Sequence, residues 1–93
     1  MEQLTPYRES IDAIDEQIIE LLGQRYSVCR DVARLKKASE IPMMQSGRVE
    51  QVKKRCAELA ERHGVDPGFV RELYALIIDE ACRIEDRIIE ASD

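Results

Sequence analysis

An apolar stripe with helical spacing runs through the first 35 residues and constrains the fold more than any other feature. From Leu4 to Leu35, residues recur at alternating steps of three and four, which is the period of one face of an α-helix. Arg25 is the one charged residue at these positions. The stripe consists of Leu4, Tyr7, Ile11, Ile14, Ile18, Leu21, Arg25, Val28, Val32 and Leu35.

The stripe predicts a helix that is too long for a compact monomer. A helix of about 32 residues is ~48 Å long at ~1.5 Å per residue. A compact chain of 93 residues has a diameter of only ~32 Å. The projecting part would expose its apolar residues, so we predict an intertwined homodimer in which a second copy covers them. A monomeric three-helix hairpin with a frayed end is the alternative.

The boundaries of this first helix are predicted from its capping residues. Thr5 and Pro6 suit the N-cap and the first helical position. Pro42 disfavours helix in the residue before it, so the helix is expected to end near Ser39. Residues 39–47 are predicted to form a connecting loop.

Two shorter helices are predicted after this loop. The second is expected from about Arg48 to Arg62, with Ser46 as its N-cap and Gly64 as a left-handed cap at its C-terminal end. The third is expected to follow the N-cap Asp66 and to run from Pro67 to about Ala91.

The composition agrees with one all-α domain over residues 1–93. The chain is 44% hydrophobic and 35% charged, which is too apolar for a disordered chain and too charged for a membrane protein. Aromatic and turn-forming residues are scarce, which disfavours a β fold. No apolar run approaches the ~20 residues of a membrane span. Residues 1–10 lack the basic and apolar segments of a signal peptide.

The net charge limits the kinds of partner that the protein can bind, and the cysteines indicate its cellular compartment. A net charge of −5 disfavours nucleic acid and anionic membranes, and taken alone it also argues against an anionic ligand. Cys29, Cys56 and Cys82 lack the spacing of a disulfide framework or a zinc site. We therefore expect reduced cysteines, no metal and a cytoplasmic location.

Arg25 and Lys36 are cations on the apolar side of the first helix. A fixed charge there is unfavourable unless an anion meets it. Glu20 or Asp31 could pair with Arg25, or its guanidinium group could bind the carboxylate of a ligand. Lys36 lies ~16 Å along the axis and within ~20° of the same face, so both side chains could converge on one polar molecule. Arg8 lies ~25 Å away on another side and would join such a site more easily across a dimer.

Other polar residues stand near apolar positions later in the chain. Glu85 lies between Ile84 and Ile88, and it is either solvated at the edge of the apolar face, the commoner case, or buried. Ala81, one turn earlier, leaves a gap for a ligand or a neighbouring helix. Arg48 adds a cation near the start of the second helix, where the helix dipole favours anions.

The sequence contains no recognisable set of residues for covalent or metal-dependent catalysis. His63 precedes a helix-ending glycine and is expected to be a surface cap residue. There is no glycine-rich phosphate loop and no cluster of metal ligands. Any catalysis is therefore expected to act by positioning and electrostatics, without a cofactor.

The sequence resembles the all-α chorismate mutases of the shikimate pathway from Leu4 to about Ile89. The matching segments are RESIDAID at 8–15, LLGQR at 21–25, RLK at 34–36, the loop at 42–48 and LYALIID at 73–79. The resemblance implies three helices per chain in an intertwined homodimer with two active sites built from both subunits. It also implies the [3,3] rearrangement of an enolpyruvyl ether that carries two carboxylates.

The resemblance further implies roles for single residues. Arg25 of one chain and Arg8 of the other would hold the two carboxylates of the substrate. Lys36 would contact the ether oxygen and one carboxylate. Glu85 would donate a hydrogen bond to the same oxygen, which only its neutral form can do.

The resemblance also concerns the part of the site that faces the substrate ring. Arg48 and the backbone around Gln45 would line it. Val49 stands where many family members have a carboxylate that accepts from the C4 hydroxyl, and Ala81 where some have serine. With these residues the sequence most resembles the subgroup that acts on 4-amino-4-deoxychorismate in antibiotic pathways. The segments that carry this similarity are PMMQSGRV at 42–49 and CRIED at 82–86.

Three alternatives stay open. Chorismate mutases convert chorismate to prephenate in aromatic amino-acid biosynthesis. An isochorismate pyruvate-lyase shares the fold and a similarly apolar residue at the position of Val49. The non-enzymatic alternative is a helical dimeric adaptor, although an adaptor has no reason to place these charges among apolar positions.

Overall fold

The chain consists of three α-helices within the residues that the structure describes, 2–41 and 47–91. In this computed structural model they are α1 (Thr5–Ser39), α2 (Arg48–Arg62) and α3 (Pro67–Glu90). Neither described segment contains a strand. The prediction of an all-α chain with three helices is confirmed.

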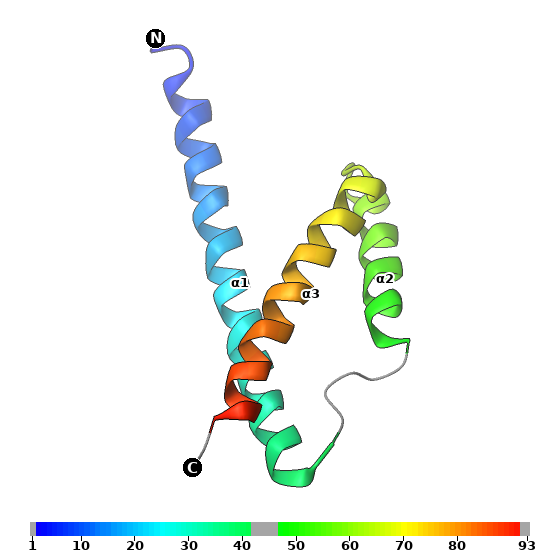
Figure 1. Cartoon of the computed structure of the whole chain (residues 1–93). Coiled ribbons are helices and arrows are strands. Elements are labelled where there is room, and N and C mark those ends of the chain that lie inside the picture. The colour runs from blue at the N-terminus through cyan, green and yellow to red at the C-terminus, as the bar shows by residue number, and fades with distance from the viewer. Residues whose placement is uncertain (1, 42–46, 92–93) are drawn as a thin grey trace.

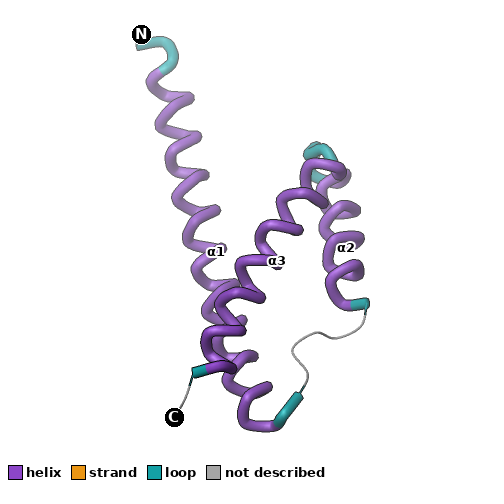
Figure 2. The backbone as a smooth tube through the Cα atoms, in the orientation of Figure 1, coloured by secondary structure: helices purple, strands orange, loops and turns teal. Residues whose placement is uncertain are grey.

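The three helices form an elongated molecule. α3 packs against both other helices, whereas the N-terminal half of α1 extends away from this body (Figures 1 and 2). The Cα radius of gyration is 16.9 Å and the principal extents are 56 × 29 × 15 Å. A compact chain of this length would have a radius of gyration of about 12 Å. The first helix therefore overshoots the body, as the length of the stripe predicted.

The predicted ends of α2 and α3 are confirmed at two caps. Asp66 is the N-cap of α3, and its carboxylate accepts a hydrogen bond from the Phe69 N–H at 2.8 Å. After α2, Gly64 adopts a φ of 71°, a left-handed conformation that favours glycine. The Val65 N–H then donates to the Ala60 carbonyl at 2.9 Å, which closes the helix end.

Two predicted N-caps are wrong by one residue. Leu4 is the N-cap of α1, because the Thr5 N–H donates to the Glu2 carbonyl at 3.3 Å and Thr5 already belongs to the helix. Gly47 is the N-cap of α2 with a left-handed φ of 79°, which favours glycine. The predicted cap Ser46 lies outside the described residues.

The apolar core is small and lies between α2 and α3. Its members are Val52, Cys56, Ala60 and Val70, with Tyr74 and Ile78 packed against them. No large side chain of the described residues is fully buried. The single chain thus buries little of its apolar surface.

The C-terminal half of α1 is joined to α3. Ala33 is 0% exposed, which is the deepest burial on α1. The Tyr26 hydroxyl donates to the Ile77 carbonyl at 3.3 Å, and the Lys37 ammonium group donates to the Ala91 carbonyl. These contacts fix the part of α1 that carries the candidate site.

The apolar stripe of α1 is exposed on the single chain. Tyr7 is 70% exposed, Ile14 54% and Leu21 61%. A continuous apolar face of this length is typical of an interaction surface. None of the helices in the described segments is both long enough and apolar enough to cross a membrane.

Candidate active site

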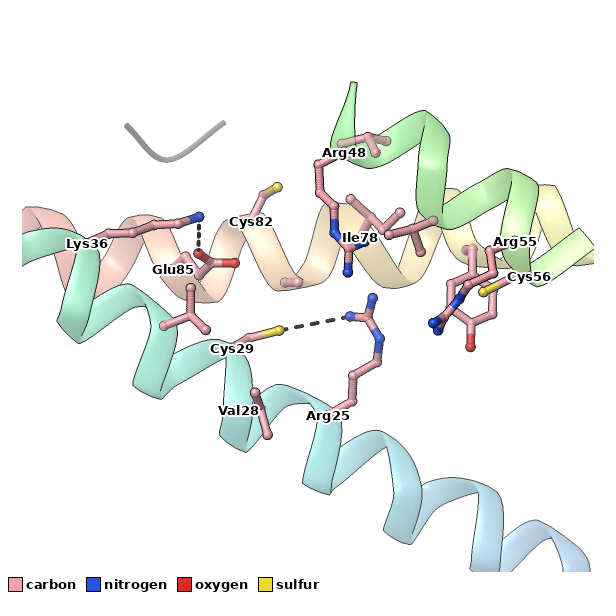
Figure 3. Close-up of a pocket in the computed structure, with 15 residues that line it drawn as sticks. Arg25, Val28, Cys29, Lys36, Arg48, Arg55, Cys56, Ile78, Cys82 and Glu85 are labelled. Carbon is pink, nitrogen blue, oxygen red and sulfur yellow. Dashed lines mark hydrogen bonds and ion pairs between the residues drawn. The ribbon is translucent and has the colours of Figure 1, made fainter. Parts of the chain in front are cut away.

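An open cavity of about 480 Å³ is lined by residues of all three helices (Figure 3). Its polar lining consists of Arg25, Lys36, Arg48, Arg55, Tyr74 and Glu85. Its apolar walls are Val28, Val32, Val49, Val52, Ile78 and Ala81. The volume and the mixture of apolar walls with a few polar groups are typical of a small-molecule site.

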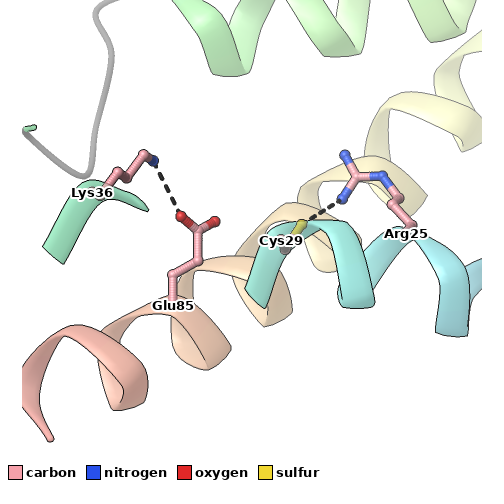
Figure 4. A network of polar contacts seen from close by, with 4 residues as sticks. All are labelled: Arg25, Cys29, Lys36 and Glu85. Atoms are coloured by element: carbon pink, nitrogen blue, oxygen red, sulfur yellow. Dashed lines mark hydrogen bonds and ion pairs between the residues drawn. The ribbon is translucent and has the colours of Figure 1, made fainter. Parts of the chain in front are cut away.

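Lys36 and Glu85 form a buried ion pair at one end of the cavity (Figure 4). The distance from Lys36 Nζ to Glu85 Oε1 is 3.1 Å, and the two side chains are 14% and 11% exposed. The interpretation of Glu85 as a solvated edge residue is therefore wrong. Burial is tolerated because the ammonium group of α1 compensates the carboxylate of α3.

Arg25 points into the same cavity from α1 and contacts two neutral side chains there. Its Nη1 donates to Cys29 Sγ at 3.9 Å, and its Cζ lies 5.7 Å from the centroid of the Tyr74 ring. The ring orients the guanidinium group by a cation–π interaction without cancelling its charge. Arg25 and Lys36 thus line one space, as their spacing on the helix predicted.

The structural alternative for Arg25 was an ion pair with Glu20 or Asp31. Within the described residues neither carboxylate pairs with Arg25, and Asp31 instead pairs with Arg34 at 3.0 Å. The guanidinium charge of Arg25 is therefore left for a ligand or a second chain.

The other predicted site residues divide into three groups. Arg48, Val49 and Ala81 line the cavity. Arg8 is exposed on the projecting half of α1 and does not line the cavity of its own chain. Gln45 lies outside the described residues.

Two polar lining residues were not predicted from the sequence. Arg55 follows Arg48 by seven residues on α2, and Tyr74 precedes Ala81 by seven on α3. Residues seven apart lie near one face of a helix, two turns from each other. This spacing is the signal that could have extended the predicted site along both helices.

Cys29, Cys56 and Cys82 are free cysteines, and all three line the cavity. Burial raises the pKa of the Cys29 thiol, and the positive charge of Arg25 opposes this effect only in part. Burial also raises the pKa of Cys82, and the negative charge of Glu85 raises it further. Both thiols are therefore neutral at neutral pH.

The charges around the cavity favour an anionic ligand. Among the described lining residues, four are cations and one, Glu85, is an acid. Because Glu85 pairs with Lys36, the charges of Arg25, Arg48 and Arg55 remain uncompensated by carboxylates within the described segments. The described residues contain no cluster of side chains suited to a metal ion. The site can hold a small anion through guanidinium groups without further chemistry from the chain.

Fold and site together define an all-helical protein with a cation-lined small-molecule cavity. The model of the type II chorismate mutase family matches residues 7–86, and the chain belongs to this family. Chorismate mutases are isomerases, so the family is one of enzymes.

Three relatives show the range of activities among similar proteins. The chain is 38% identical to 4-amino-4-deoxychorismate mutase of Streptomyces pristinaespiralis over 92% of its own length and 67% of the relative. It is 39% identical to 4-amino-4-deoxychorismate mutase of Streptomyces venezuelae over 94% of its length and 84% of the relative. It is also 39% identical to isochorismate pyruvate lyase of Pseudomonas aeruginosa, over 81% of its length and 73% of the relative.

The raised pKa values of Cys29 and Cys82 predict slow alkylation in the native protein. Only the thiolate reacts, so at a given pH the native thiols should react more slowly with iodoacetamide than the same thiols in urea. The alkylation rates of the native thiols should rise with pH, and the midpoint of each rise should lie at a higher pH than in the denatured protein. Mass spectrometry of the labelled peptides measures the alkylation rate of each cysteine. A native midpoint at or below the denatured one would contradict the prediction.

Proposed function

We propose that this protein is a mutase that rearranges a chorismate-type enolpyruvyl ether, with 4-amino-4-deoxychorismate as its substrate. The observation that carries the proposal is the cavity, where Arg25 and the Lys36–Glu85 pair line one space of small-molecule size. The family match and the two Streptomyces relatives support it. We also infer a cytoplasmic location, which the free cysteines support because reducing compartments keep thiols unpaired.

The reaction requires positioning and charge stabilisation. In a [3,3] rearrangement the ether C–O bond breaks while a C–C bond forms, with no net proton transfer and no second substrate. The enzyme must hold the enolpyruvyl arm over the ring and stabilise the negative charge that develops on the ether oxygen. A cavity lined by cations supports both tasks.

Arg25 would hold one carboxylate of the substrate. Its planar guanidinium group can donate two parallel hydrogen bonds to a carboxylate. Cys29 and Tyr74 orient it but leave its charge available. The second carboxylate would be bound by Arg8 from a second copy of the chain, since Arg8 does not line the cavity of its own chain.

Lys36 and Glu85 would act at the ether oxygen. They bind each other at 3.1 Å, so the ether oxygen would have to be placed between them. Lys36 would then stabilise the developing charge as a cation. Glu85 would help only as a neutral acid that donates a hydrogen bond, because an ionised carboxylate would repel that charge.

The contact at the C4 substituent supports the amino substrate. Val49 is half-buried and lines the cavity, and its side chain has no hydrogen-bond acceptor. A buried hydroxyl at C4 would lose a partner next to it, which disfavours chorismate.

A pyruvate-lyase acting on isochorismate is the second candidate. The Pseudomonas relative, which is 39% identical, favours it. The same cations would hold the dicarboxylate. As the ether C–O bond breaks, a new C–C bond would give the mutase product, whereas transfer of a ring hydrogen to the enolpyruvyl methylene carbon would release pyruvate.

Product analysis tests the proposal directly. The protein is offered 4-amino-4-deoxychorismate, chorismate and isochorismate separately, and products are identified by mass spectrometry. We expect the amino substrate to give the highest kcat/KM and a product of unchanged mass. If release of pyruvate from isochorismate is the fastest reaction, the lyase is favoured. If none of the three substrates is converted, the adaptor is favoured.

Arg25→Ala should lower kcat/KM by about 100-fold or more, because a charge-assisted contact to the substrate is lost. Arg34→Ala, which lies outside the cavity, should leave kcat/KM unchanged.

Two variants test the role of Glu85 as a hydrogen-bond donor. Glu85→Gln keeps a donor at the same place, so it should retain most of the wild-type kcat. Glu85→Ala removes the donor and should lower kcat by about 100-fold. Steady-state kinetics of both variants measure this. A Glu85→Gln protein as inactive as Glu85→Ala would exclude this role.

The oligomeric state tests the contribution of a second chain. We expect a mass of about twice the 10.7 kDa of one chain in sedimentation velocity. Ile14→Glu places a charge on the exposed stripe and should produce monomers without activity, because the partner's Arg8 is then lost. Gly23→Glu is the matched control: Gly23 is exposed, lies off the stripe, and a side chain there meets nothing within 4 Å. A monomeric, active wild type would overturn the shared site.

A further inference from the structure

The end of the cavity opposite the Lys36–Glu85 pair carries Arg55, a cation that has no anionic partner among residues 2–41 and 47–91. Arg55 is an exposed residue of α2, directly before the buried Cys56, and its side chain lines the open cavity. Glu58, one turn further on α2, is an acid in reach on the same helix, since residues three apart are neighbours. No ion pair joins the two residues, and Figure 3 shows the Arg55 side chain reaching into the space between α1 and α2.

Tyr74 shows that the charges of Arg25 and Arg55 act on the same part of the cavity. The Tyr74 ring lies 5.7 Å from the Arg25 guanidinium carbon. Burial, the largest effect, raises the pKa of Tyr74, and Cys56 raises it further. The positive charges of Arg25 and Arg55 both act in the opposite direction. Two cations from different helices therefore lie near one phenol group.

Two like charges in one partly enclosed space repel each other unless an anion lies between them. Arg25, Arg48 and Arg55 all line the cavity, and Glu85, the one acid among its described lining residues, is paired with Lys36. A carboxylate is the small anion whose geometry best suits guanidinium donors. This end of the cavity is thus suited to the carboxylate of a ligand.

We propose that Arg55 is a substrate-binding residue, which together with Arg25 holds one carboxylate group of the substrate at the Tyr74 end of the cavity. This proposal rests on the proposed function, which supplies a dicarboxylate substrate. It adds a cation from α2 to the carboxylate site that Arg25 forms on α1. Arg55 is a binding group here and takes no part in the bond changes.

The test compares Arg55→Ala and Arg55→Lys with wild type. The probe is an oxabicyclic dicarboxylate that mimics the transition state, and its Kd is measured by calorimetry. Arg55→Ala should weaken binding by about tenfold, since one charge-assisted contact is lost, and Arg55→Lys should recover part of it. KM should rise with little change in kcat, because the carboxylate is bound equally in the ground state and the transition state. Lys54→Ala is the control, because Lys54 is an exposed cation next to Arg55 that does not line the cavity.

A spectroscopic readout shows whether the Arg55 charge acts in the cavity. Ultraviolet titration of tyrosinate, with Tyr74→Phe to assign the signal, should show a higher Tyr74 pKa in Arg55→Ala than in wild type. The Lys54→Ala protein should titrate like wild type. Circular dichroism checks that each variant is folded, and Arg55→Lys serves if the alanine variant is not.

The outcomes separate the two proposals. Weaker binding in Arg55→Ala, with partial recovery in Arg55→Lys and none of these effects in Lys54→Ala, supports the assignment of Arg55. A wild type that binds the probe, with an unchanged Kd in Arg55→Ala, overturns this assignment alone. A wild type that neither binds the probe nor turns over any of the three substrates overturns the proposed function and the assignment with it.

Discussion

The packing of α3 against both α1 and α2 is the interaction on which the rest of the structure depends. Toward α2, α3 contributes Val70 to the small apolar core. Toward α1, it places Glu85 beside Lys36. Because the other two helices meet α3 on different faces, the space between them stays open and becomes the cavity. One helix thus holds the fold together and carries one side of the site.

The distribution of charge matters more than its sum. The chain has a net charge of −5, which taken alone argues against an anionic ligand. Its acids, however, include exposed carboxylates that pair with arginines one turn away, such as Asp31 with Arg34 and Glu80 with Arg83. The cavity contains four cations and a single acid among its described residues. A site for an anion therefore coexists with an acidic protein.

The features that could be predicted are those that local sequence determines. The apolar period and the Asp66 cap define helices within a few turns of chain, so all three helices were predictable. The cap of α1 was misplaced at Thr5, because a turn before the helix shifts its start by one residue. The burial of Glu85 was not predictable, since its partner Lys36 lies 49 residues away. From the sequence, Arg55 cannot be distinguished from a surface cation, because only the packing of α2 on α3 brings it near Tyr74.

The absence of any fully buried large side chain among the described residues has a consequence for how the protein is held in its folded state. A chain with so small a core gains little stability by itself. If a second copy covers the stripe, folding and association become one equilibrium, and the temperature of unfolding rises with the protein concentration. Dilution then lowers the concentration of complete, dimeric sites more steeply than the concentration of chains. The specific activity of such a protein depends on how much of it a cell makes.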